Sequence, residues 1–196
     1  MPRTPRFDRH EALDRAVDLF WSRGYYASSM KHIEQALDMR PGSLYATFGS
    51  KSGLFAEALA LYAAQTGDGF RRMIETAPDL VEGLQNYLRS LASPASGPAR
   101  ACMLIKTLLE INAEDAALRT QADAMLATVE QGFCAVLEQA KARGELRADV
   151  DCARLARLLQ AQIIGLRAFA ERRVSAEQVA GLAEDMASLL DAYRAR

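Results

Sequence analysis

The chain has 196 residues, half of them hydrophobic, so it can bury the core of one domain of ordinary size and of a second, smaller one. Its net charge of −1 excludes a protein that coats nucleic acid by bulk charge, although residues 1–51 hold eight Lys and Arg against six acidic residues. Ala, Leu, Glu and Arg are abundant and β-branched runs are scarce, which indicates an all-helical (all-α) fold.

The first three predicted helices are short and separated by tight turns. The first begins after Asp8, whose side chain can cap free backbone N–H groups, and ends at Gly24. The second is MKHIEQAL, and either Ser28 or Ser29 is expected to cap it. Asp38 tolerates the next turn, and the third helix, PGSLYATF, starts with a proline that suits a first turn. Such a triplet is typical of a helix-turn-helix, but it also occurs as plain core.

The remainder of the chain is predicted to be helical too. Ser50 can cap a fourth helix, which residues 66–69 either end or only bend, and the SPASGP loop at 93–98 is the clearest break. Ser175 is expected to cap the last helix. The predicted segments are 51–66, 79–91, 99–111, 115–143, 151–172 and 175–194.

The last two of these segments carry more apolar surface than one buried stripe needs. The second face is buried either within the monomer or against the same pair of helices from another subunit. We favour the second alternative, a homodimer.

The sequence gives little support for a metal-binding protein, a membrane protein or an enzyme. Three widely spaced cysteines and two histidines fit neither a disulfide framework nor a zinc site, so no metal and no cofactor are expected. No window approaches the ~18 apolar residues of a membrane helix, and no apolar stretch follows the basic N-terminus, which predicts a soluble, cytoplasmic protein without a membrane partner. An enzyme lacks a catalytic constellation, so a helical protein-interaction module is the main alternative to a DNA-binding protein.

A specific motif lies in ALDRAVDLFWSRGYYASSMKHIEQAL and PGSLYATFGSKSGLFAEAL. The order Phe-x-x-x-Gly-Tyr, Ser cap, Gly-x-Leu-Tyr-x-x-Phe and Ser-Lys-x-x-Leu-Phe resembles the N-terminal domain of the tetracycline-repressor (TetR) family over residues 7–62. The positions in register are Phe20, Gly24, Tyr25, Ser28, Ile33, Gly42, Leu44, Tyr45, Phe48, Ser50, Lys51, Leu54 and Phe55. Of these, the apolar side chains from Phe20 to Phe55 are expected to form a small core.

The resemblance implies a helix-turn-helix DNA-binding domain over residues 1–62, with the motif at about 29–48. It also implies a helical ligand-binding and dimerisation domain over residues 63–196. A member of this family would be a repressor that binds a palindromic double-stranded DNA operator as a dimer and is released by a small-molecule effector.

The candidate DNA contacts lie near the start and on the outer face of the third helix, where a groove-facing helix needs close approach and hydrogen-bonding groups. Tyr45 and Lys51 resemble family positions that hold phosphates. The family turn of Gly, apolar residue and Ser or Thr is replaced by Asp38, Met39 and Arg40, so Arg40 reads a guanine edge or holds a phosphate. A basic arm, Arg3 and Arg6, either reaches DNA or stays solvated. The set is Ser28, Ser29, Arg40, Pro41, Gly42, Ser43, Tyr45, Ala46, Thr47 and Lys51.

Candidates for an effector pocket are the larger side chains of the C-terminal helices, each of which is also read as plain core. Cys102 lies in RACMLIKTLLEIN, which resembles a segment where some family members sense electrophiles or oxidants through a thiol. Arg100 and Lys106 are near enough to activate such a thiol, and a buried inert cysteine is the alternative. Cys134 and Cys152 are interpreted as small hydrophobes. The set is Tyr87, Cys102, Met103, Leu104, Leu108, Met125, Phe133 and Phe169.

Overall fold

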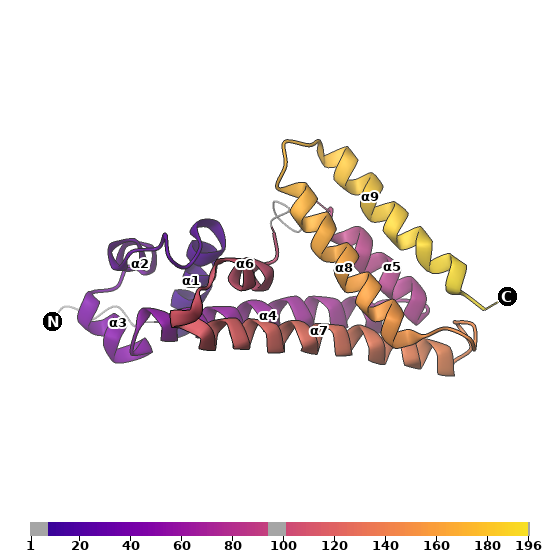
Figure 1. The fold of residues 1–196 in the computed structure, drawn as a ribbon, viewed down its shortest axis with the longest axis horizontal. Helices are drawn as coiled ribbons and strands as arrows, with labels where there is room; N and C mark the ends of the chain where they lie inside the picture. Colours follow the sequence, from indigo (N-terminus) through magenta and orange to yellow (C-terminus); the bar gives the residue numbers. More distant parts are fainter. Residues whose placement is uncertain (1–7, 94–100, 196) are drawn as a thin grey trace. The chain divides into compact units, whose positions relative to one another are not determined.

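A computed structural model describes residues 8–93 and 101–195 and confirms the all-helical prediction (Figure 1). Within these ranges no β-strand occurs, and Leu146 and Arg194 form an isolated bridge. Part of the predicted break at 93–98 and the arm with Arg3 and Arg6 lie outside the described residues. The helices are α1 (Arg9–Arg23), α2 (Met30–Leu37), α3 (Pro41–Phe48), α4 (Lys51–Thr76), α5 (Leu80–Ser90), α6 (Met103–Glu110), η2 (Ala113–Asp115), α7 (Ala116–Ala142), α8 (Cys152–Ala170), α9 (Ala176–Ser188) and η3 (Leu189–Tyr193).

Local capping explains where the first helices begin and end. The Asp8 carboxylate accepts hydrogen bonds from the N–H groups of His10 and Glu11, at 2.9 and 3.3 Å, and α1 ends at Gly24 with φ +86°. Ser29 caps α2 in a capping box whose second member is His32. The predicted start and end of α1 and the predicted bounds of α2 are therefore confirmed.

The chain divides into two compact units. The first extends to Gln65 and also includes Lys106–Asp123, and the second comprises the described residues of Thr66–Ile105 and Ala124–Arg196. The helices α4, α6 and α7 each contribute residues to both units.

The core of the first unit consists of the apolar side chains predicted for it. Phe20, Ile33, Leu44, Phe48 and Phe55 are all buried, and the Phe20 and Phe55 rings meet edge to face at 4.9 Å. Between α3 and α4 the chain turns so closely that a Cβ on Gly53 would lie 2.3 Å from the Phe48 carbonyl oxygen. The Ser50 hydroxyl accepts a hydrogen bond from the Gly53 N–H at 2.9 Å and caps α4 as predicted.

Of the two alternatives for residues 66–69, the one in which they end α4 is wrong. The helix continues through Gly67 and Gly69 to Thr76, because Phe70, Met73 and Ile74 pack against the core of the second unit. Burial of these three side chains outweighs the cost of about 1 kcal/mol that each glycine adds in a helix interior.

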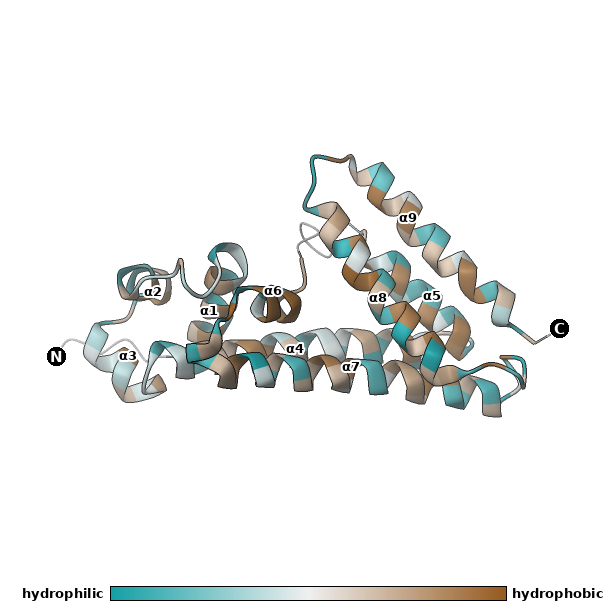
Figure 2. Ribbon diagram, viewed as in Figure 1, coloured by the Kyte–Doolittle hydropathy of each residue, from teal (hydrophilic) through white to brown (hydrophobic). Residues whose placement is uncertain are grey.

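The second unit has one continuous hydrophobic core. Leu84 of α5, Leu137 of α7, Leu159 of α8 and Ala183 of α9 lie in it, and α5 packs against α9 (Figure 1). The predicted last segment, 175–194, is capped by Ser175 and divides into α9 and η3. Hydrophobic and hydrophilic residues alternate along α9, as expected for a helix with one face on this core (Figure 2).

The described residues contain neither a membrane-spanning helix nor a group of side chains placed to hold a metal ion. None of the helices in 8–93 and 101–195 is long and apolar enough to cross a membrane. No group of three or more His, Cys, Asp or Glu side chains in the same ranges is placed to hold a metal ion.

Candidate nucleic-acid interface

The third helix buries one face and exposes the other. Leu44 and Phe48 are buried in the first unit, one turn apart. Five of the predicted contact residues are exposed to solvent: Pro41, Gly42, Ser43, Tyr45 and Ala46. Thr47 is half-buried, and Arg40, at the N-cap, is exposed and makes no side-chain cap. The polar side chains of Arg40, Ser43 and Tyr45 are therefore accessible to a ligand.

Asp38 and Met39 hold the turn before α3, and of these two only Asp38 departs from the family pattern. Asp38 adopts the left-handed conformation, with φ 52° and ψ 44°, and its N–H donates to the Glu34 carbonyl oxygen. Met39 is buried. The prediction that Asp38 makes the turn and that Met39 keeps an apolar contact is confirmed.

The two serines before α2 have different roles. Ser29 is the cap, and its hydroxyl accepts from the His32 N–H at 3.3 Å. Ser28 is 0% exposed, and its hydroxyl donates to the Gly24 carbonyl oxygen at 2.7 Å. Ser28 is thus a structural residue here rather than one of the predicted DNA contacts, because its only polar side-chain group is buried and occupied.

Tyr45 and Lys51 lie close together. Both line one shallow pocket, together with Met30 and Ser50. Tyr45 is 52% exposed, whereas the Lys51 ammonium lies 4.5 Å from the centroid of the Tyr25 ring. Desolvation lowers the pKa of Lys51, and the nearby carboxylate of Glu110 opposes this shift. Lys51 is therefore a half-buried cation at the edge of the exposed face.

A contact that sequence reasoning missed braces the turn between α1 and α2. The Glu110 carboxylate at the end of α6 accepts from the backbone N–H groups of Tyr25, at 3.1 Å, and Tyr26, at 2.7 Å. The hydroxyls of the same two tyrosines donate to Asp115, at 3.3 and 3.1 Å. We call Glu110 and Asp115 the acidic brace. It lies about 85 residues from its partners in the chain, so no local pattern could have found it.

The same segment contacts α1 and α4. Lys106 donates to the Trp21 carbonyl oxygen at 2.6 Å, and Gln121 donates to the Ala56 carbonyl oxygen at 2.9 Å. At Gly24 a Cβ would lie 2.7 Å from a Glu110 carboxylate oxygen, so this glycine supplies space for the acidic brace as well as a positive φ. Residues 106–123 are thus part of the unit that presents α3.

The predicted pocket residues are only partly brought together. Tyr87 and Phe133 meet Phe70 in a cluster of rings with centroids 4.9–6.0 Å apart. Burial raises the pKa of Tyr87, and Arg167 and Cys102 are near enough to alter it further.

The other predicted pocket residues are not members of this ring cluster. Met103 and Leu104 are buried, Met125 is half-buried, and Leu108 belongs to the first unit. Phe169 lies 4.8 Å beneath the Arg172 guanidinium. Cys134 is half-buried and Cys152 is buried.

Three short helices with a buried core and an exposed third helix define a helix-turn-helix protein of the DNA-binding class. Residues 12–58 match the bacterial regulatory proteins of the tetR family, and residues 76–180 match the tetracyclin repressor-like C-terminal domain. The chain therefore belongs to the TetR family and is a DNA-binding transcriptional regulator.

Individual relatives agree with this assignment. The chain is 28% identical to the HTH-type transcriptional repressor ComR of Escherichia coli (strain K12), over 90% of the chain and 86% of ComR. A cysteine mutant of the regulator CifR, solved with 26-base-pair operator DNA, is 35% identical with a TM-score of 0.85, over 95% of the chain and 98% of CifR. A regulator from Cytophaga hutchinsonii shares the fold over the full length of both chains, with a TM-score of 0.87 at 18% identity.

Proposed function

We propose that the chain binds a palindromic operator as a symmetric dimer through α3, represses transcription there, and is released by a small molecule or an electrophile. The observation that carries the proposal is the exposed face of α3, whose polar groups are accessible. CifR, which is similar over nearly the whole chain, was solved on operator DNA, and this supports operator binding here. Such a regulator acts in the cytoplasm on the chromosome and needs no catalytic group.

The proposed DNA-binding residues fall into two classes. Ser29, Tyr45 and Lys51 hold phosphates and set the register of the protein on the duplex. The side chains that face the bases are those at the start and on the outer face of α3, where an entering helix meets the major groove. They are Arg40, Pro41, Gly42, Ser43, Ala46 and Thr47.

The proposed dimer interface is the outer face of the last two long helices. On α8, Leu158, Ala161, Gly165 and Ala168 are exposed at helical spacing, and Leu158 is 44% exposed. Leu182 of α9 and Leu189 of η3 are also exposed large apolar side chains. A second copy of the chain would cover these surfaces in a two-fold arrangement.

The proposed effector site is the ring cluster of Tyr87, Phe133 and Phe70, with Cys102 as a reactive thiol. Mild electrophile treatment should lower the operator affinity of the wild-type protein and of a Cys134→Ser variant. It should leave the affinity of Cys102→Ser unchanged. Unchanged affinity in the treated wild-type protein would end the thiol part of the proposal.

The acidic brace supports a route for release. Glu110 is the last residue of α6, a helix that begins in the second unit and ends in the first, where it holds the turn before α2. An effector that binds more tightly when α6 is in one of two positions would favour that position. The fraction of the protein whose α3 can bind the operator would then change according to the difference between the two affinities.

Selection of duplex DNA from a random library tests the main proposal. The selected sequences should align as two inverted half-sites about one helical turn apart, and affinity should fall steeply between roughly 50 and 200 mM salt. Arg40→Ala should bind more weakly, and Arg172→Ala, an exposed arginine after α8, should bind as the wild type does. Failure to select any duplex would favour a protein-interaction module instead.

A panel of operator point mutants separates the two roles of Arg40. A guanidinium that reads a guanine edge discriminates by about 1–3 kcal/mol at one base pair, and Arg40→Ala would lose this discrimination. Uniform weakening of binding across the panel would rule out base reading and leave a phosphate contact.

A further inference from the structure

One line of α3 carries almost no side chain. Gly42 and Ala46 are four residues apart, so they lie one above the other on the exposed face. Ser43 and Thr47 form the neighbouring line with the same spacing. Between Arg40 and Lys51 the exposed face therefore offers mainly small groups.

Gly42 has no internal reason to be glycine. A Cβ added there would meet no atom within 4 Å, and its φ lies outside the positive range that favours glycine. Glycine in a helix also costs stability relative to alanine. A close approach of the helix backbone to a binding partner would give glycine a role at this place.

The Thr47 hydroxyl is engaged within α3, which leaves the methyl group as the side chain's apolar contact group. The hydroxyl donates to the Ser43 carbonyl oxygen at 2.8 Å, so its proton is used within the helix. The side chain is half-buried, and beside the hydroxyl it carries a γ-methyl group. Ala46, exposed beside it, presents only its β-methyl.

We propose that Ala46 and Thr47 read thymine through its 5-methyl group, with Gly42 allowing the helix to lie close to the bases. In the major groove thymine is the base that displays a methyl, and alanine and threonine methyls are its apolar partners. The inference rests on the proposed function, because it assumes that α3 enters the groove. Base recognition along this line is by apolar contact, and Arg40 supplies the long polar side chain at the head of α3.

Two variants of Thr47 separate the contribution of its methyl group to operator affinity from that of its hydroxyl group. Thr47→Ser keeps the hydroxyl bond to Ser43 and removes the methyl, whereas Thr47→Val keeps a methyl and removes the hydroxyl. On a duplex selected with the full-length protein, Thr47→Ser should bind about fourfold more weakly, the effect of one buried methyl group, and Thr47→Val should bind nearly as the wild type does. The reverse order would overturn the proposal.

Changing the DNA tests the same contact from the other side. Replacing each operator thymine in turn by deoxyuracil removes only the methyl group. One or two positions in each half-site should lose about fourfold in wild-type affinity, and Thr47→Ser should no longer respond at the position that Thr47 contacts. Equal binding of all uracil duplexes by the wild type would refute methyl recognition while leaving DNA binding intact.

The variant Gly42→Ala is expected to raise thermal stability and to lower operator affinity. The free protein should melt about 2 °C higher, because alanine is the better helix residue and its Cβ meets open space. Operator affinity should nevertheless fall by at least fourfold if the backbone lies against the bases. Unchanged affinity would overturn the close approach. Failure of the wild-type protein to select any DNA would instead contradict the proposed function itself.

Discussion

Glu110 binds two consecutive backbone N–H groups at the turn that separates α1 from α2. A half-buried carboxylate with two backbone donors is a charge-assisted arrangement, stronger than a neutral hydrogen bond. Asp115 adds the two tyrosine hydroxyls. The position of α2, and through the next turn that of α3, thus depends on single residues far along the chain.

Glu110→Ala should lower the free energy of unfolding by about 2 kcal/mol, because two N–H groups lose a charged acceptor. Glu114→Ala is the matched control, since Glu114 is exposed on η2 nearby, and its effect should be within about 0.5 kcal/mol of zero. Urea unfolding measures both. Equal stabilities of the two variants would contradict the role given to the acidic brace.

The raised pKa of Tyr25 predicts that the stability of the protein depends on pH in the alkaline range. Burial, with help from the adjacent Asp115 charge, raises the pKa of Tyr25 from 10.0 to about 12. A raised pKa in the folded state means that stability is complete below pH 10 and is lost as the pH rises toward 12.

The stability advantage of the wild-type protein over Tyr25→Phe should therefore narrow across that interval. Urea midpoints at several alkaline pH values measure it. Tyr45→Phe, at an exposed tyrosine, is the control and should show no such narrowing. A constant difference between wild type and Tyr25→Phe would mean that Tyr25 ionises alike in the folded and unfolded chain.

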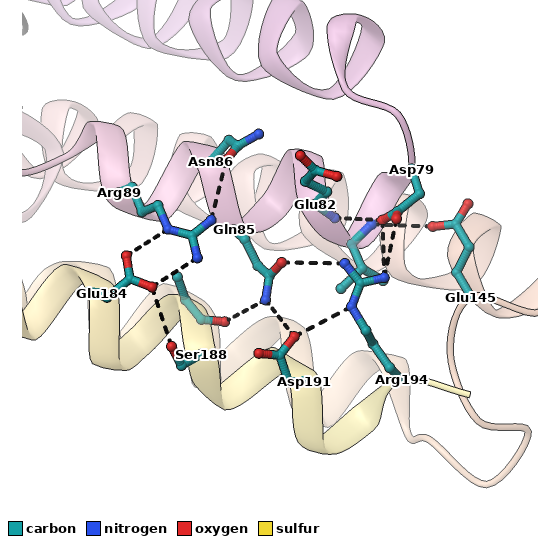
Figure 3. Close-up of polar contacts among 12 residues, drawn as sticks. Asp79, Glu82, Gln85, Asn86, Arg89, Glu145, Glu184, Ser188, Asp191 and Arg194 are labelled. Atoms are coloured by element: carbon teal, nitrogen blue, oxygen red, sulfur yellow. Dashed lines mark hydrogen bonds and ion pairs between the residues drawn. The ribbon is translucent and has the colours of Figure 1, made fainter. Parts of the chain in front are cut away.

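At the scale of elements, a polar seam joins α5 to α9 and the chain after it (Figure 3). Arg194 pairs with Asp79 at 3.2 Å and with Asp191 at 3.4 Å, and it donates to the Gln85 side-chain oxygen at 3.3 Å. The buried Gln85 side chain in turn donates to Asp191 at 2.8 Å. The seam fixes the register of α9 on α5, since each polar group has its partner in only one arrangement.

Arg194→Met should lower the free energy of unfolding by about 1–3 kcal/mol, because Gln85 and Asp79 lose a charged partner at a partly buried site. Arg89→Met removes the pair with Glu184, whose side chains are 40% and 53% exposed, and should cost less than about 1 kcal/mol. Thermal unfolding of both variants gives the order. A larger loss for Arg89→Met would show that exposure does not decide the strength of these pairs.

At the scale of the whole molecule, operator binding depends on two copies of α3. Leu158→Asp places a charge on the proposed interface and should give a monomer in sedimentation. Operator affinity should fall on the order of 100-fold, because the second half-site is no longer tethered. Leu109→Asp is the control, since Leu109 is 83% exposed on α6, outside the proposed interface. A dimeric Leu158→Asp protein would place the interface elsewhere.

Short-range signals decided much of what could be predicted. Asp8, Ser29, Asp38 and Ser175 act on backbone groups within a few residues, so the starts and turns they control can be read from the chain. The apolar residues from Phe20 to Phe55 recur at helical spacing, which is also a short-range signal, and this pattern identified the buried side of the helix-turn-helix. The boundary expected at residue 62 stays a prediction, and the compact unit around α3 also takes in Lys106–Asp123.

The sequence by itself therefore determined the helical class, the capped helices of the DNA-binding unit and its family. Only the tertiary structure decided that α4 continues to Thr76, that Ser28 is buried and that Glu110 braces the first turn. Each of these outcomes depends on residues that packing brings together. Packing is driven by the burial of apolar side chains, and because this driving force is non-directional, the sequence does not specify which distant residues will meet. The exposed face of α3 combines the two. Its residues are neighbours in the sequence, whereas the acidic brace that supports it lies far along the chain.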